Sequence, residues 1–114
     1  MAKYEAHLAG NFDDILRTID SEILRKSMTA HFEDGSDFRM GNTQCAVRVY
    51  ERYSAIGSNR VSLSVTLFGE QNQHYLSAVT SGGSQAVFFK INTLGEEAFL
   101  RQLVSAVQPF QTTG

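Results

Sequence analysis

Two arginines and a tyrosine occupy alternate positions of this sequence, at Arg48, Tyr50 and Arg52. Two guanidinium groups beside a phenol are suited to hold an anionic or an aromatic ligand. Alternate residues of a strand share one face, so we expect this set to lie with polar and aromatic residues of neighbouring strands. The expected companions on that face are Ser62, Ser64, Thr66, Phe68 and Phe88.

A sheet face that mixes arginines with exposed phenylalanines resembles the composition of protein interfaces. We therefore expect this face to meet a second copy of the chain or a small anionic or aromatic ligand. The alternative is a solvated outer face, on which arginines and hydroxyl groups provide solubility and cross-strand pairing.

A second candidate is the glycine-rich stretch Ser81, Gly82, Gly83 and Ser84. Consecutive backbone N–H groups flanked by hydroxyls could bind a phosphate or a carboxylate. The stretch lacks the lysine of a P-loop and does not open a helix. Glycines between strands commonly form a bulge or a tight turn, and we favour that structural role over anion binding.

The histidines and the cysteine show no pattern typical of a metal or catalytic site. His7, His31 and His74 are far apart in the sequence, and no H-x-x-x-H pair is present. The single cysteine, Cys45, excludes an intramolecular disulfide bond. We expect surface histidines, no metal and no cofactor.

Acidic residues gather at Glu33, Asp34 and Asp37, next to a glycine. They lack further ligands at the spacing of a calcium-binding EF-hand, and a polar turn accounts for them without a metal. The sequence contains no recognisable nucleophile motif or carboxylate pair. We therefore expect no catalytic residue and rank an enzyme below a binding protein.

Hydrophobic periodicity predicts the elements that position these residues. A strand at Met28–Glu33 is followed by the turn signal Asp34-Gly35-Ser36, and Asp37–Met40 forms either a further strand or a continuation past a bulge. A loop is expected at Gly69–Gln73. The other expected strands are Lys3–Ala9, Cys45–Tyr53, Arg60–Phe68, His74–Ser81 and Ala86–Ile91.

Amphipathic patterns predict two helices, one capped by Asn11 and one that includes Ala98–Val107 and ends before Pro109. A capping box at Thr93 would start the second helix, or Leu94-Gly95 would delay its start by two residues. Strand and helix patterns together predict one buried face. Its expected members are Val47, Val49, Val61, Leu63, Val65, Leu67, Ile15, Ile19, Phe99 and Leu103.

This order of elements predicts a two-layer α+β fold, in which an antiparallel meander of five or six strands carries both helices on one face. The order is similar to helix-grip and TATA-box-binding-protein-like architectures. A length of 114 residues predicts one domain, residues 1–109, with a frayed tail from Phe110 to Gly114.

The overall charge is balanced, with a formal net charge of −2. This balance gives no hint of the concentrated basic field of a nucleic-acid binder, with a local basic stripe left open as the alternative. No stretch is long and apolar enough for a signal peptide or a membrane span. We expect a cytoplasmic protein that binds neither nucleic acid nor a membrane.

Four stretches resemble a family of short bacterial proteins that is defined only as a domain of unknown function. They begin at Ala46 (AVRVYERY), Asn59 (NRVSL), Thr80 (TSGGSQA) and Gly95 (GEEAFL). The family occurs mostly in Gram-positive anaerobes, and the resemblance covers nearly the whole chain. It implies a bacterial, cytoplasmic setting and no particular activity.

Two classes of function remain open from the sequence. The first is a non-enzymatic binding or assembly module, a homo-oligomer that uses the polar and aromatic face of the sheet. The second is a small-ligand-binding domain with a pocket between the sheet and the C-terminal helix. A cavity under that helix would favour the second class, and a filled interface would favour the first.

Overall fold

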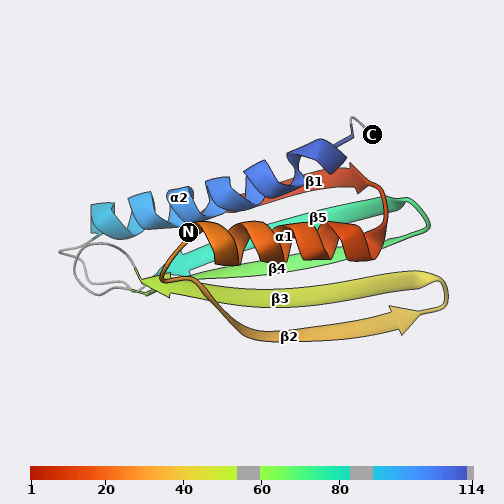
Figure 1. Ribbon diagram of the computed structural model, residues 1–114, viewed down its shortest axis with the longest axis horizontal. Helices are drawn as coiled ribbons and strands as arrows, with labels where there is room; N and C mark the ends of the chain where they lie inside the picture. The colour runs from red at the N-terminus through yellow and green to blue at the C-terminus, as the bar shows by residue number, and fades with distance from the viewer. Residues whose placement is uncertain (54–59, 83–88, 113–114) are drawn as a thin grey trace.

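The computed structural model describes residues 1–53, 60–82 and 89–112, and for residues 89–94 the backbone alone (Figure 1). The described chain contains five strands, two α-helices and a short 3-10 helix. Their bounds are β1 (Lys3–Ala9), α1 (Phe12–Lys26), β2 (His31–Met40), β3 (Thr43–Tyr53), β4 (Arg60–Glu70), β5 (Gln73–Gly82), α2 (Phe89–Val107) and η2 (Gln108–Phe110).

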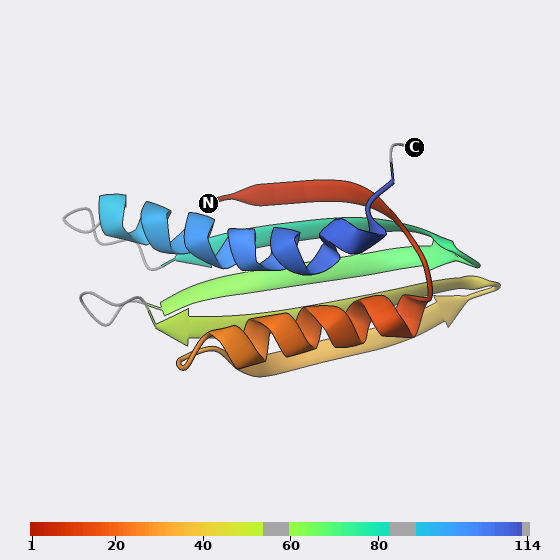
Figure 2. The same cartoon turned by 45° about the horizontal axis from the view of Figure 1, so that its top comes forward.

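The described strands form one antiparallel sheet in the order β1-β5-β4-β3-β2. Strands β2 to β5 follow each other as a meander, and β1 pairs with β5 at the far edge. Helices α1 and α2 lie side by side on one face of this sheet (Figures 1 and 2). The expected two-layer α+β fold is confirmed.

Helix α1 forms where its cap and its apolar stripe predict it. The Asn11 side chain accepts a hydrogen bond of 2.9 Å from the Asp14 backbone N–H, which satisfies one free donor of the first turn. The residues Ile15, Ile19 and Ile23 recur at helical spacing and are fully buried against the sheet.

Strand β4 lies at the centre of the sheet and shows the predicted alternation. Its inward side chains Val61, Leu63, Val65 and Leu67 have no exposed surface. Phe99 from α2 belongs to the same buried cluster. The core therefore lies between the sheet and the two described helices.

Strand β2 differs from the sequence prediction. It runs continuously from His31 to Met40, so Asp34-Gly35-Ser36 lies inside a strand and forms no turn. The register with β3 shifts between Phe32 and Asp34, and the expected alternative of a continuation past a bulge is the correct one. Turn-forming residues are tolerated here because β2 is an edge strand that is exposed along its whole length.

The chain after β5 also differs from the prediction. Gly82 still belongs to β5, and Phe89, Lys90 and Ile91 belong to α2, so the strand expected at Ala86–Ile91 is wrong for its last three residues. The helix starts before the capping box expected at Thr93. A short apolar run fits a strand and a buried helix equally well, which explains the error. Residues 83–88, which include Gly83, Ser84 and Phe88, lie outside the described part of the chain.

The C-terminal segment lies against β1, although we expected it to fray from Phe110. Phe110 packs against the core, and Gln111 forms a bridge with Leu8. The Thr112 backbone N–H donates a hydrogen bond of 2.9 Å to the carbonyl oxygen of His7. The segment therefore occupies part of the β1 edge of the sheet.

Candidate functional site

The three candidate residues of β3 lie on the helix-covered face of the sheet, which contradicts the sequence prediction. Residues directly opposite each other in an antiparallel pair project from the same face. Each candidate lies opposite a fully buried residue of β4: Arg48 opposite Val65, Tyr50 opposite Leu63, and Arg52 opposite Val61. The face that they were expected to share with Ser62, Ser64 and Phe68 is therefore the opposite one.

Tyr50 connects β3 to α1 inside the core. Its side chain has no exposed surface, and its hydroxyl donates a hydrogen bond of 3.0 Å to a carboxylate oxygen of Asp20. Burial and the neighbouring Asp20 charge raise the pKa of Tyr50 well above its ordinary value, because both disfavour the phenolate. Tyr50 therefore has a structural role and is not available to a ligand.

The two arginines beside it are also engaged within the chain. Arg52 donates hydrogen bonds to the Gln102 side chain (3.2 Å) and the Gly95 carbonyl oxygen (3.3 Å), and its guanidinium lies 4.7 Å from the ring centre of Phe99. Burial lowers the pKa of Arg52 below its usual range. Arg48 forms an ion pair of 2.9 Å with Asp37 on β2. These contacts join β3 to α2 and to the edge strand.

The raised pKa of Tyr50 predicts a loss of stability at alkaline pH. The folded state holds the phenol proton more tightly than the unfolded chain, so this contribution is complete below pH about 10 and declines as the pH rises above it. Stability should then fall by up to about 1.4 kcal/mol per pH unit from this one group.

Urea unfolding between pH 8 and pH 11 measures this effect, with Tyr50→Phe as the comparison. The variant lacks the titrating proton, so its stability should decline less steeply than that of the wild type. Equal slopes for the two proteins would show that Tyr50 ionises in the folded state as easily as in the unfolded chain.

The face of the sheet that neither α1 nor α2 covers is the remaining candidate, and we name it the open face. In the register of the described strands, three rows of side chains cross it from β1 to β2. They are His7–Tyr75–Phe68–Cys45–Phe38, Glu5–Ser77–Thr66–Val47–Ser36 and Lys3–Val79–Ser64–Val49–Asp34.

The first row is mostly aromatic. Phe68, on the central strand, is 44% exposed, and its ring centre lies 5.7 Å from that of Tyr75. Tyr75 in turn meets His7 edge to face at 5.1 Å. At the β2 end, Phe38 is 58% exposed. Large apolar side chains exposed in the middle of a sheet indicate a contact surface.

The valines of β3 belong to this open face as well. Val47 lies opposite Thr66 and Val49 opposite Ser64, so both face away from the helices, although we expected them in the core. Cys45 lies between Phe68 and Phe38 in the first row. Partial burial raises the pKa of its thiol, and the negative charge of Asp37 adds a smaller effect in the same direction. A protonated thiol behaves here as a small apolar group.

A charged cluster that the sequence did not suggest lies at one end of the open face. His31, Glu33 and Glu51 bring their ligand atoms within 4.8 Å of one another, a geometry that could hold a metal ion. Arg60 forms ion pairs with both carboxylates, and its bond to Glu33 is 2.9 Å long. Hydrogen bonding with Glu51 and the nearby positive charges lower the pKa of Glu33.

Arg60 already supplies a positive charge beside the carboxylates of Glu33 and Glu51, where a metal ion would otherwise have to supply it. We therefore assign the cluster a structural role. The bulge at Glu33 brings its side chain to the same side as His31. The sequence indicated a bulge in this region only as one of two alternatives, and the pairing of β2 with β3 is what places His31 opposite Glu51. The sequence alone therefore did not predict that these three side chains lie together.

The glycine-rich stretch is placed only in part. Ser81 and Gly82 lie within β5, opposite Ser62 and Val61, and Ser81 faces the open side. A regular strand pairing at these two residues offers no cradle of free N–H groups for an anion.

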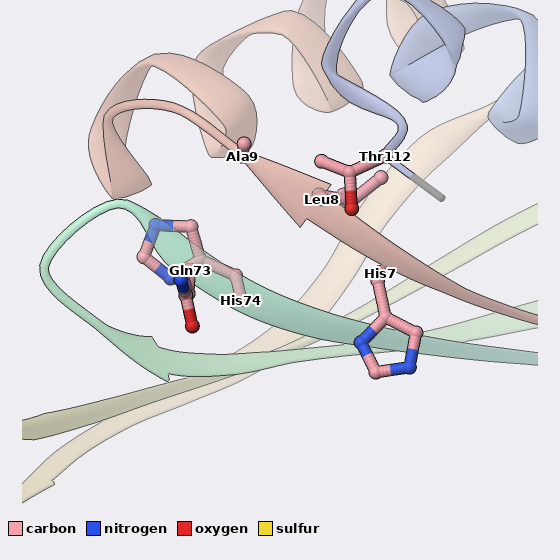
Figure 3. A pocket seen from close by; sticks show the side chains of 6 residues that line it. All are labelled: His7, Leu8, Ala9, Gln73, His74 and Thr112. Atoms are coloured by element: carbon pink, nitrogen blue, oxygen red, sulfur yellow. The ribbon is translucent and has the colours of Figure 1, made fainter. Parts of the chain in front are cut away.

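A small pocket of about 280 Å³ lies where β1 ends and β5 begins (Figure 3). Its lining residues are His7, Leu8, Ala9, Gln73, His74 and Thr112. The two histidines lie on opposite faces of the sheet, because His7 pairs with Tyr75 while His74 pairs with Leu8. They therefore reach this pocket from opposite sides of the sheet.

His74 is a core residue and not the surface histidine that we expected. It is 4% exposed, its ring packs edge-on against Phe12 at 5.4 Å, and its Nε2 lies 2.8 Å from the carbonyl oxygen of Gly10. Gly69, opposite His74 on β4, leaves the required space, since a Cβ there would lie 2.6 Å from the His74 Cα.

Comparisons with known proteins assign a family without an activity. No helix in the described residues is long and apolar enough to cross a membrane. A comparison with curated proteins found no match. Residues 1–111 match the sequence model of DUF6054, a family of unknown function, and the chain therefore belongs to this family.

Proposed function

We propose that the chain is a small non-enzymatic binding or assembly module of the bacterial cytoplasm, and that the open face is its contact surface. The observation that supports this proposal most directly is the exposed aromatic row across the sheet. Phe68 lies on the central strand yet is 44% exposed, with Tyr75 and Phe38 in the same row. A partner that covers this row would remove a large apolar area from water.

The open face differs from an ordinary solvated sheet face. Val47, Val49 and Val79 add apolar area around the aromatic row, and the residues between them are mainly serine and threonine. Charged residues such as Lys3 and Asp34 lie at the outer strands. An apolar centre with a polar and charged rim is the composition of an interface.

The alternative proposal, a ligand pocket under the C-terminal helix, has less support. Phe99, Leu103 and Val107 of α2 have no exposed surface and pack into the core cluster. The described turns of α2 therefore fill the space between helix and sheet. We prefer the open face for this reason.

Replacing Phe68 with glutamate should abolish the complexes that the protein forms, because a charge would be placed at the apolar centre of the contact. Affinity-tagged protein isolated from its own cells and analysed by native mass spectrometry provides the measurement. The wild type should appear in complexes heavier than its own 12.6 kDa, and the variant only at 12.6 kDa.

Phe32→Glu is a matched control. Phe32 has nearly the same exposed fraction, 46%, but lies opposite Tyr50 on the helix-covered face. This variant should keep the complexes of the wild type, and urea unfolding should show that both variants remain folded. Complexes of unchanged mass in Phe68→Glu would contradict a contact role for the open face.

A further inference from the structure

We propose that the partner of the open face is a second copy of the chain, packed face to face about a two-fold axis parallel to β4. This inference rests on the proposed function and adds the identity and the orientation of the partner. Strand β4 is the middle strand of the described sheet. An axis along it would place β5 over β3 of the partner and β1 over β2 of the partner.

The aromatic row is self-complementary under this axis. Phe68 lies on β4 and would meet Phe68 of the partner subunit, while Tyr75 would lie over Cys45 of the partner subunit. His7 would lie over Phe38 of the partner subunit at each end of the row. Face-to-face sheets pack about 10 Å apart, which is a distance that aromatic side chains from both copies can fill.

The charges of a second row choose between the possible axes. Lys3 stands at the β1 end of its row and Asp34 at the β2 end, with Val79, Ser64 and Val49 between them. The axis along β4 brings Lys3 over the partner's Asp34. The two-fold symmetry repeats this contact, so two ion pairs stabilise the dimer.

A two-fold axis across the strands would place the first and third rows of the two copies over each other, which is unfavourable. It would place Asp34 over Phe38 of the partner subunit and Lys3 over His7 of the partner subunit, which leaves both charges without a counter-charge. The axis along β4 also brings Val79 over the partner's Val49, so that apolar residues meet. We therefore prefer this axis.

The size of the open face is sufficient for a specific dimer. Five strands about 4.8 Å apart and about eight residues long present a flat patch of roughly 600 Å². Standard protein interfaces bury about 800 Å² on each partner, and the side chains that project from the patch enlarge its area. The dimer would thus lie close to the standard size.

The edges of the sheet are less suited to self-association than its open face. The segment of Gln111 and Thr112 already occupies part of the β1 edge. The β2 edge carries a bulge and the carboxylates of Glu33, Asp34 and Asp37, which discourage strand pairing between copies.

Charge reversal in the purified chain tests this arrangement. Sedimentation equilibrium should give the wild type twice the monomer mass of 12.6 kDa. Lys3→Glu and Asp34→Lys should each weaken the dimer roughly tenfold, because each change places like charges opposite each other twice per dimer. The double variant Lys3→Glu/Asp34→Lys should return to within about threefold of the wild type, since both pairs are restored with reversed sign.

Lys26→Glu reverses a charge on α1, away from the open face, and should leave the dimer unchanged. Urea unfolding of each variant accompanies the measurement, because Asp34 also accepts a hydrogen bond from the Gly35 N–H. A double variant as weak as the single variants would overturn the proposed axis.

A purified wild type that stays monomeric at a concentration of about 100 μM would overturn the second copy as the partner. Its dissociation constant would then be weaker than about 100 μM, which is weak even for a transient contact. If complexes from cells were still lost in Phe68→Glu, the proposed function would stand and only this inference would fail. If both results were negative, neither proposal would survive.

Discussion

Replacing Tyr50 with alanine should lower the free energy of unfolding by about 3–5 kcal/mol, the loss measured for large buried aromatic side chains. Tyr50 has no exposed surface, and its ring lies in the core cluster between β3 and α1. The change would also leave Asp20 without the hydroxyl that donates to it. Urea unfolding monitored by circular dichroism measures the difference.

Val49→Ala is the control for this prediction, because Val49 precedes Tyr50 and faces the opposite side of the sheet. Its replacement should cost about 1 kcal/mol or less, as expected for a partly exposed strand residue. The sequence prediction, with Val49 in the core and Tyr50 outside, requires the reverse order of the two losses. A larger loss for Val49→Ala would therefore support the sequence prediction against the structure.

The error in β3 has a physical origin. Both faces of this strand carry apolar groups, since Val47 and Val49 alternate with the ring of Tyr50 and the long stems of Arg48 and Arg52. A shift of one residue in register exchanges the two faces of a strand. The sequence of β3 itself shows no turn signal that fixes this register, so the sequence could not decide between the faces.

Polar partners make the observed choice of face stable. The hydroxyl of Tyr50 reaches Asp20 on α1, and Arg52 reaches Gln102 on α2. These partners are 30 and 50 residues away in the sequence, and hydrophobic periodicity contains no information about them. Large polar side chains inside this fold could be recognised only once both helices were placed.

Elements with one clear apolar stripe were predicted correctly. Strand β4 and helix α1 each bury one set of residues at a regular spacing, and both lie where the sequence indicated. Strand β2 has no buried residue that would mark its course, so its turn-forming residues were misleading. Among the candidate site residues, Phe68 faces the open side, as the alternation in β4 predicted.

Leu63→Ala should lower the free energy of unfolding by about 2–5 kcal/mol, because a buried leucine loses its transfer energy and leaves a cavity. Leu63 has no exposed surface and lies opposite Tyr50 and Thr80 at the centre of the core. Ser64→Ala is the matched control on the next residue, which is exposed on the open face, and should change stability by no more than about 0.5 kcal/mol. Urea unfolding of both variants provides the measurement. A loss below about 0.5 kcal/mol for Leu63→Ala, within the range of surface substitutions, would contradict the placement of α1 and α2 over this side of β4.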